Sequence, residues 1–273
     1  MPASPAPERP REACNGAVRI TYEVKGGGEP LLMIHGLGYD RFGWGRLPEL
    51  LAAELSVIVF DNRGVGDSDV PDGPYAVSQM VDDAVAVLDA EGLERAHVLG
   101  VSLGGYIAQE FALTYPERLR KLVLASTAPG GPRSVPMPAK GIEAFGRFPL
   151  LEREAGLRLM VENSLGDYGV REQPELVEEI YAYRLERAPT LAGWQAQAFA
   201  GATFDAYDRA GEIAAPTLVL QGGADNVVDP RNAELLVRLI PNARLELVAE
   251  RGHLLVWQEA ERIAPIVKEF LRS

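Results

Sequence analysis

The sequence predicts an α/β protein in which a mostly parallel sheet is covered by helices on both faces. Short apolar runs alternate with helical patterns along most of the chain, and this alternation is typical of parallel strands joined by helices. A strand-free stretch from 128 to about 213 interrupts the alternation. The chain has 273 residues, 47% hydrophobic and 24% charged, so it can bury a full core as one large domain or as one domain with an insertion.

The strands are predicted from short apolar runs bounded by turn residues. The segment KGGGEP at 25–30 separates the first two runs and is interpreted as a hairpin turn. A phosphate-binding loop is not favoured there, because no helix follows it. The expected strands are 17–24, 31–35, 56–61, 97–101, 122–126, 217–221 and 244–249.

The helices between these strands are predicted from apolar residues spaced three and four positions apart. Such a stripe covers 81–88, and Ser78 is its expected N-cap. Further helices are expected over 103–115 and 233–240, and a last one from about Arg262.

The strand-free stretch predicts a helical insertion. Because open parallel sheets bind ligands at the carboxyl ends of their strands, we expect this block to lie over that edge as a lid. The predicted organisation is a flexible N-terminal tail at 1–16, a core made of 17–129 and 214–273, and a lid at 130–213. The helical patterns in the lid cover roughly 142–151, 153–164, 174–186 and 190–201.

The composition of the chain indicates which binding partners and which cellular compartment to expect. The formal net charge of -12 at pH 7 argues against nucleic acids and anionic membrane surfaces, which favours a small neutral substrate. The start MPASPAPERPREA lacks the apolar segment of a signal peptide, and no apolar run approaches the about 20 residues of a membrane span. Cys14 has no internal disulfide partner, so the cytoplasm is the expected location. Monomer and homodimer both stay open.

The segment HVLGVSLGGYIA at 97–108 places Ser102 between two glycines where a strand gives way to a helix. The pattern G-x-S-x-G in that context is typical of a nucleophile elbow. Gly100 and Gly104 would let the strand and helix backbones approach closely. A serine that merely caps the helix has the same local pattern, so the assignment also needs a base and an acid elsewhere in the chain.

The chain contains three histidines, and one of them is suited to be the base. The expected order for a nucleophile elbow is serine, acid, histidine, and only His253 follows Ser102 in the chain. His35 is interpreted as a structural hydrogen-bonding residue and His97 as a surface or edge residue.

The acid is expected in a loop at the end of a strand between the serine and the histidine. Asp225 lies four residues past the expected strand at 217–221, after two glycines that let the chain turn. Asp229 is the alternative in the same loop, but it precedes Pro230 and is expected to cap the next helix. Asp225 is therefore the predicted acid.

An oxyanion site needs two backbone N–H groups directed at the developing negative charge. Leu103, directly after Ser102 at the start of a helix, is expected to supply one of them. Leu37 in HGLG is expected to supply the other, since Gly36 and Gly38 would let the backbone approach the substrate.

The lid is expected to provide an apolar substrate pocket. Trp194, Phe145 and Phe199 are the predicted substrate contacts. The cations of the lid lie mostly among glutamates on helix faces that are typical of solvated surfaces, which predicts a preference for uncharged esters or lactones. These cations are Arg133, Lys140, Arg147 and Arg184.

The sequence gives no support for a metal or a cofactor. No two histidines are near each other, which argues against a metal site. The segment DNRGVGDSD at 61–69 lacks the third glycine of a dinucleotide fingerprint, and Pro71 and Pro74 break the helix that should follow. Activity is therefore expected to be independent of metal ions and nucleotides.

These motifs together resemble the α/β-hydrolase family. HGLG, DNRGVGDSD, GVSLGG, GGADNVV and RGHLL stand in that family's order and spacing, and the resemblance covers about 17–272. It implies an eight-stranded sheet with an antiparallel second strand, a lid after the sixth strand and no cofactor. Epoxide hydrolases and haloalkane dehalogenases of this fold use an aspartate at the elbow, so Ser102 argues against both.

The predicted function is a serine hydrolase that cleaves small to medium carboxylic esters or lactones through an acyl-enzyme. The core also looks like 3-oxoadipate enol-lactonases, and the alternatives include that activity, carbon-carbon bond hydrolysis and cofactor-free haloperoxidase activity. A different class, a receptor-like ligand-binding protein with incidental hydrolysis, would fail to turn over small esters above background.

Overall fold

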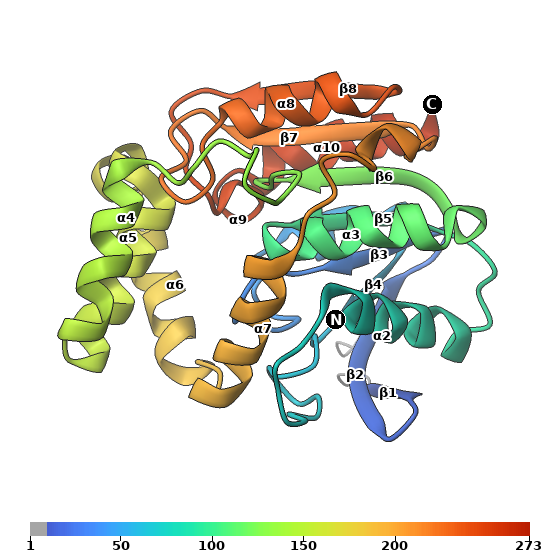
Figure 1. Ribbon diagram of the computed structural model, residues 1–273, viewed down its shortest axis with the longest axis horizontal. Coiled ribbons are helices and arrows are strands. Elements are labelled where there is room, and N and C mark those ends of the chain that lie inside the picture. The colour runs from blue at the N-terminus through green and yellow to red at the C-terminus, as the bar shows by residue number, and fades with distance from the viewer. Residues whose placement is uncertain (1–9) are drawn as a thin grey trace, which may run out of the picture.

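The computed structural model describes residues 10–273 and is built around one eight-stranded sheet (Figure 1). The strand order is β1-β2-β4-β3-β5-β6-β7-β8. β2 is antiparallel to both β1 and β4, and every other neighbouring pair is parallel. The expected mostly parallel sheet with an antiparallel second strand is confirmed. The strands are β1 (Arg11–Asn15), β2 (Val18–Gly26), β3 (Glu29–Ile34), β4 (Leu55–Phe60), β5 (Ala96–Val101), β6 (Leu119–Ala125), β7 (Thr217–Gly222) and β8 (Ala243–Val248).

The N-terminal strand corrects the expected tail. A flexible segment over 1–16 is wrong for its second half, because Arg11–Asn15 pair with β2 and the Ala13 side chain packs into the core. Cys14 lies in this strand with its side chain exposed. Residues 1–9 lie outside the described residues, so the expectation for them stays a prediction.

The segment at 25–30 is not a hairpin turn. β2 and β3, which it connects, are not neighbours in the sheet, because β4 lies between them and pairs with both. The chain therefore passes the end of β4 at this point. Gly26 makes the turn with φ 75°, and only a residue without a side chain fits there, because a Cβ would lie 2.2 Å from the Ala52 carbonyl oxygen.

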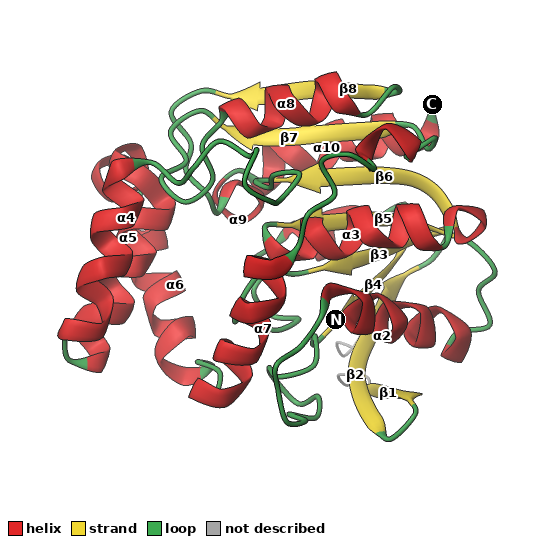
Figure 2. Ribbon diagram, in the orientation of Figure 1, coloured by secondary structure: helices red, strands yellow, loops and turns green. Residues whose placement is uncertain are grey.

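Two helical layers cover the sheet, and alternation along the strands decides which side chains face each layer (Figure 2). In β3, Leu32 and Ile34 pack with α2, α3 and α8, whereas Leu31 and Met33 pack with α1, α9 and α10. The helices of the core are α1 (Leu47–Leu51), α2 (Val77–Ala90), α3 (Leu103–Thr114), α8 (Arg231–Leu239), α9 (Leu255–Gln258) and α10 (Ala260–Arg272), with the 3-10 turns η1 (Pro116–Arg118) and η3 (Ala210–Glu212).

Helix ends differ slightly from the predictions. α2 begins at Val77 with Ala76 as its N-cap residue, so Ser78, the expected cap, lies inside the first turn. The Gln79 side chain accepts the Ala76 N–H at 3.0 Å, which replaces the predicted serine cap. α10 begins at Ala260, two residues before the predicted start.

Four helices and two 3-10 turns, the second of which is η3, lie between β6 and β7, as the strand-free stretch predicts. Figure 1 shows α4, α5 and α6 beyond the arrowheads of the strands, at the carboxyl edge of the sheet. α5 continues past its predicted end to Glu172, with a break at Gly166. The elements are α4 (Ala139–Arg147), η2 (Phe148–Leu150), α5 (Arg153–Glu172), α6 (Pro174–Glu186) and α7 (Leu191–Thr203).

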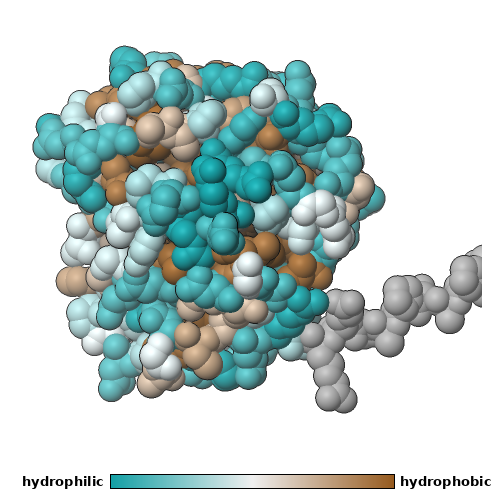
Figure 3. Space-filling model, turned by 90° about the vertical axis from the view of Figure 1, so that its right-hand side faces the viewer, coloured by the Kyte–Doolittle hydropathy of each residue, from teal (hydrophilic) through white to brown (hydrophobic). Residues whose placement is uncertain are grey.

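The two ends of the sheet differ in polarity. Figure 3 shows the end away from α4, α5 and α6, which is covered largely by hydrophilic residues with small apolar areas between them. Ion pairs lie at this end, where Glu29 contacts Arg120 at 2.8 Å. The apolar cavity described below lies at the other end.

The close packing of α3 on the sheet generates a first prediction. A Cβ on Gly104 would lie 1.9 Å from the Ile34 carbonyl oxygen, which the backbone cannot accommodate. Gly104→Ala should therefore lower the free energy of unfolding by about 3 kcal/mol or more, at the upper end of overpacking costs. Gly146→Ala, where nothing lies within 4 Å, is the matched control. Equal unfolding temperatures for the two variants would contradict the close contact.

Candidate active site

Ser102 occupies a strained turn between β5 and α3. Its backbone has φ 55° and ψ -119°, a conformation that residues other than glycine rarely adopt. The turn is held by two contacts, since the Ser102 N–H donates to the Ala125 carbonyl at 3.0 Å and Thr127 Oγ1 donates to the Ser102 carbonyl at 2.9 Å. The geometry is that of a nucleophile elbow, with the serine at the carboxyl edge of the sheet.

His253 and Asp225 are hydrogen-bonded, as the sequence predicts for a base and its orienting acid. His253 Nδ1 lies 2.9 Å from Asp225 Oδ2, and both residues are buried. Because a carboxylate only accepts hydrogen bonds, Nδ1 carries the proton and Nε2 is left free to accept one. Asp229 instead accepts hydrogen bonds from the backbone and guanidinium of Arg231.

Three further hydrogen bonds fix the Asp225 carboxylate. Gln221 Nε2 donates to Oδ2 at 3.0 Å, and the backbone N–H groups of Val227 and Val228 donate to Oδ1 at 2.7 and 2.9 Å. The carboxylate therefore holds one orientation toward His253. Gln221 is a contact that the sequence prediction missed, since nothing in a strand pattern marks it.

His35 is buried and structural, in the way the sequence analysis interpreted it. Its Nε2 donates to the Gly43 carbonyl at 2.7 Å, and its Nδ1 accepts the Gly36 N–H at 2.7 Å. The ring stacks on Tyr39 with centroids 4.7 Å apart. Burial lowers the pKa of His35 to about 3, so the ring is neutral at physiological pH.

His97 is not a surface residue, which corrects the prediction. It lies in β5 with 2% of its surface exposed, and Nε2 contacts Glu29 Oε2 at 3.2 Å. The contact is at the end of β5 that is remote from Ser102, because His97 is the second residue of the strand that Ser102 follows. The sequence position near a strand end did not indicate burial, whereas β5 lies between β3 and β6 inside the sheet.

The two candidate oxyanion amides flank the serine. Within residues 10–273, neither the Leu37 nor the Leu103 N–H donates a hydrogen bond to a protein acceptor. Gly36 brings the Leu37 loop against the elbow, because a Cβ there would lie 3.0 Å from Ser102 Cβ. Both N–H groups are thus available next to the hydroxyl, as an oxyanion site requires.

Gln197 of α7 fixes the loop that carries Leu37. Its Oε1 accepts the Gly38 N–H at 3.0 Å, and its Nε2 donates to the Arg63 carbonyl at 2.7 Å. The side chain is fully buried. This contact spans more than a hundred residues of sequence, and no local pattern marks it.

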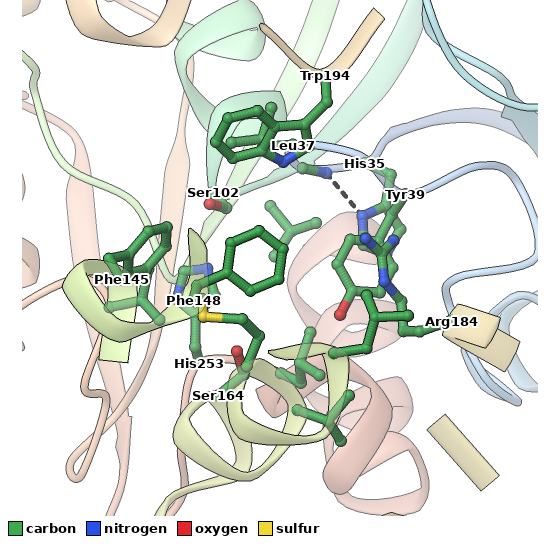
Figure 4. A pocket seen from close by; sticks show the side chains of 17 residues that line it. His35, Leu37, Tyr39, Ser102, Phe145, Phe148, Ser164, Arg184, Trp194 and His253 are labelled. Carbon is green, nitrogen blue, oxygen red and sulfur yellow. Dashed lines mark hydrogen bonds between the residues drawn. The ribbon is translucent and has the colours of Figure 1, made fainter. Parts of the chain in front are cut away.

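Ser102 and His253 line one cavity of about 140 Å³ (Figure 4). No hydrogen bond joins their side chains in the part of the chain that the structure describes. Such contacts commonly form only when a substrate is bound. The walls are mainly apolar and come largely from α4 to α7 and from the loop after β3. The lining residues are His35, Gly36, Leu37, Tyr39, Val101, Ser102, Phe145, Phe148, Leu157, Met160, Val161, Ser164, Arg184, Trp194, Val227, His253 and Leu254.

Two of the three predicted substrate contacts lie in this cavity. Trp194 and Phe145 line it, and Figure 4 shows both rings near Ser102. Phe199 does not line it, and half of its surface is exposed, which corrects the prediction. Phe199 is five residues after Trp194 on α7, so the two side chains leave the helix in different directions.

Arg184 lies in the cavity and differs in this from the other cations of the inserted segment. Its guanidinium lines the cavity, donates to the Gly38 carbonyl and lies 4.3 Å from the centroid of the Tyr39 ring. Among the described residues it forms no ion pair with a carboxylate. The other three lid cations do lie at the surface with acidic partners: Arg133 with Asp208, Lys140 with Asp167 and Arg147 with Glu143.

Two searches of the described residues bear on cofactors and membranes. No cluster of three His, Cys, Asp or Glu side chains with the geometry of a metal site occurs within 10–273. No helix in the same range has the length and apolar character that crossing a membrane requires.

Comparisons with known proteins agree with this geometry. The family model described as "alpha/beta hydrolase fold" matches residues 29–260. The chain is 35% identical over 245 residues to a poly(3-hydroxyalkanoate) depolymerase of Ectopseudomonas oleovorans, covering 89% of this chain and 84% of that protein. It is 36% identical over 271 residues to a 2-hydroxy-6-oxononadienedioate/2-hydroxy-6-oxononatrienedioate hydrolase of Burkholderia vietnamiensis, covering 93% and 91%. A solved thermophilic esterase from Thermogutta terrifontis superposes with a TM-score of 0.82 at 29% identity, covering 97% of this chain and 98% of that one.

The burial of His35 predicts how stability depends on pH. The pKa of His35 is about 3 in the folded protein, whereas an unfolded histidine has a pKa near 6.5. Between these values His35 binds one more proton in the unfolded chain, so its contribution lowers the free energy of unfolding as pH falls, by up to about 1.4 kcal/mol per pH unit. Asp61 contributes with the opposite sign, because burial raises its pKa to about 6 in the folded protein. Urea unfolding at several pH values between 7 and 4 measures this slope.

A substitution isolates the contribution of His35 to that slope. His35→Gln should lower stability at pH 7, because its buried contacts with Gly36 and Gly43 are altered. It should also make the free energy of unfolding fall less steeply as pH falls below about 6.5, and the difference in slope should correspond to about one proton. An unchanged slope in the variant would show that His35 is charged in the folded state or is not buried as described.

Proposed function

The chain belongs to the α/β-hydrolase fold family and is a hydrolase, and from that premise we propose that it cleaves carboxylic esters or lactones through an acyl-enzyme. The observation that carries the proposal is that Ser102 and the hydrogen-bonded pair of His253 and Asp225 meet at one apolar cavity. The names of the similar proteins, a depolymerase of poly(3-hydroxyalkanoate) and an esterase, support ester chemistry.

Each group has a role in the proposed reaction. Ser102 Oγ attacks the carbonyl carbon while His253 Nε2 takes its proton, and Asp225 stabilises the imidazolium that results. The N–H groups of Leu37 and Leu103 stabilise the negative oxygen of the tetrahedral intermediate. His253 then protonates the leaving alcohol oxygen, and water attacks the acyl-enzyme by the same steps.

The cavity limits the size of the substrate. Its volume of about 140 Å³ is close to that of an engineered cavity of about 150 Å³ that accommodates benzene. An acyl or alcohol group of small to medium size fits, and the rings of Phe145, Phe148 and Trp194 favour an apolar one. Because α4 to α7 supply these walls, we also propose that this segment acts as the lid of the site.

A second candidate function follows from Arg184. A buried or half-buried anion is costly unless a cation pairs with it, and Arg184 is a cation in the cavity without an acidic partner among the described residues. This favours a substrate that carries a carboxylate, as in an enol-lactone of the 3-oxoadipate type or in a carbon-carbon bond hydrolysis. The similar protein of Burkholderia vietnamiensis is named for hydrolysis of a dioate. The preference for uncharged substrates assumed that the lid cations face solvent, and Arg184 does not.

The acyl-enzyme mechanism predicts the outcome of three substitutions. Chromogenic esters of increasing acyl length, run beside lactones, should be hydrolysed fastest at short to medium length. Ser102→Ala and His253→Ala should each lower kcat by roughly a thousandfold or more, because the triad acts as a unit, and Asp225→Asn should be equal or milder. Circular dichroism should show the same fold in all three. Hydrolysis by Ser102→Ala at a tenth of the parent rate would contradict the nucleophile assignment.

The role of Arg184 predicts a change in selectivity. For a pair of esters that differ only in a terminal carboxylate, Arg184→Gln should lower kcat/KM for the charged ester about tenfold or more, since a charge-assisted hydrogen bond contributes about 1.5–3 kcal/mol. The neutral ester should change by less than about threefold on the same reasoning. Arg147→Gln, a surface pair with Glu143, is the matched control. An equal loss for both esters would assign Arg184 to supporting the Gly38 loop instead.

A further inference from the structure

The break in α5 is the starting point for an inference about how the active site is held in place. Inside this helix Gly166 has φ 70° and ψ 178°, so the helix stops and restarts there. In a continuous helix each carbonyl accepts a hydrogen bond from the N–H four residues further on. A break frees the carbonyls just before it for other partners.

The freed carbonyls accept hydrogen bonds from the two loops that carry Asp225 and His253. The Ser164 carbonyl accepts the backbone N–H of His253 at 2.6 Å and that of Leu254 at 3.3 Å. The Asn163 carbonyl accepts Asn226 Nδ2 at 3.2 Å, and Asn226 directly follows Asp225. Consecutive carbonyls of one helix are thus bonded to His253 itself and to the residue that follows Asp225.

Backbone contacts around the break are close. A Cβ on Gly166 would lie 3.2 Å from the Ala224 carbonyl oxygen and 3.8 Å from Gly252 Cα. Ala224 and Gly252 are the residues before Asp225 and His253. A Cβ on Gly252 would in turn lie 2.3 Å from the Ser164 carbonyl oxygen. At these points the backbone of α5 is in direct contact with the backbones of both loops, so a small shift of α5 moves both loops.

The two loops also contact each other. They are bonded to each other where the Ala224 N–H donates to the Arg251 carbonyl at 2.9 Å. Neither residue of the pair lies in a helix or strand, and the 2.9 Å contact between His253 and Asp225 depends on how the loops sit relative to each other. The residues around the break in α5, which belong to the inserted segment between β6 and β7, contact both loops.

We infer that Gly166 is a positioning residue, which holds His253 and Asp225 at their working separation through the carbonyls freed by the break in α5. This role rests on the proposed function, because it concerns the same acid and base pair. A backbone with φ near 70° and ψ near 180° is accessible essentially only to glycine. Any other residue at 166 would therefore displace the carbonyls of Asn163 and Ser164.

The test compares Gly166→Ala with the same substitution at another glycine of positive φ. With a short acetate ester, which contacts few cavity walls, Gly166→Ala should lower kcat about tenfold or more and change KM by less than about threefold. Gly92→Ala is the matched control, because Gly92 also has a positive φ of 66° but lies in an exposed turn with nothing within 4 Å. It should lower the unfolding temperature and leave kcat per folded molecule unchanged.

A second variant keeps the inference testable if Gly166→Ala does not fold. Asn226→Ala removes the hydrogen bond to the Asn163 carbonyl and leaves the α5 backbone intact. It should lower kcat about threefold to tenfold with KM unchanged. If every variant that folds keeps kcat within about twofold of the parent, the positioning role is wrong.

A measurement without substrate separates this inference from the proposed function. The proton on His253 Nδ1, shared with Asp225, should give a downfield ¹H NMR signal in the parent and in Gly92→Ala. The signal should be lost or shifted upfield in Gly166→Ala and Asn226→Ala. A parent that shows the signal but hydrolyses no ester would overturn the proposed function alone. An unaltered signal in both site variants would overturn the role of Gly166 alone.

Discussion

The backbone contact between α3 and the end of β3 is the constraint on which the site depends. Gly104 lets the helix approach until a Cβ would meet the Ile34 carbonyl, and this approach places the elbow beside the loop after β3. The loop that carries Leu37 and the start of α3 at Leu103 are brought next to Ser102 by the same contact. Side chains do not set this geometry, because none lies between the two backbones. The space beside the serine is therefore fixed before any substrate binds.

The sheet and the acid and base pair could be predicted from the sequence because both leave local signals. Each buried strand is a short apolar run, and alternation along it gives the two faces that the helices cover. Asp225 and His253 follow strand ends in the expected chain order, and in an α/β protein such loops converge at one edge. A few residues and their spacing were thus sufficient to predict the edge of the sheet at which the candidate site lies.

The remaining features depend on contacts that no local pattern encodes. Periodicity marks a charged helix face, but it could not show that Arg184 turns toward the cavity while Arg147 faces solvent. Gln197 is important only because Gly38 and Arg63 lie on either side of it in the folded protein. β1 was missed because an edge strand of five residues buries one alanine and leaves no apolar run. The helical pattern predicted at 153–164 ends just before Gly166, and it does not show that the helix restarts after the break and runs to Glu172.

The contacts between α7 and the core limit which parts of the inserted segment can be replaced. Ala196 and Ala200 belong to the same buried cluster as α3, and Gln197 bridges two loops of the core. By its packing, α7 belongs to the core of the fold, whereas α4 to α6 lie mainly at the edge of the sheet. Helices in place of α4 to α6 would change the walls of the cavity, but they would have to keep the carbonyls of α5 that accept hydrogen bonds from the loops of His253 and Asp225. A chimera built by grafting should accordingly place its junction before Thr190 and keep the host's residues 163–166, so that the specificity of the donor is transferred while these loops stay supported.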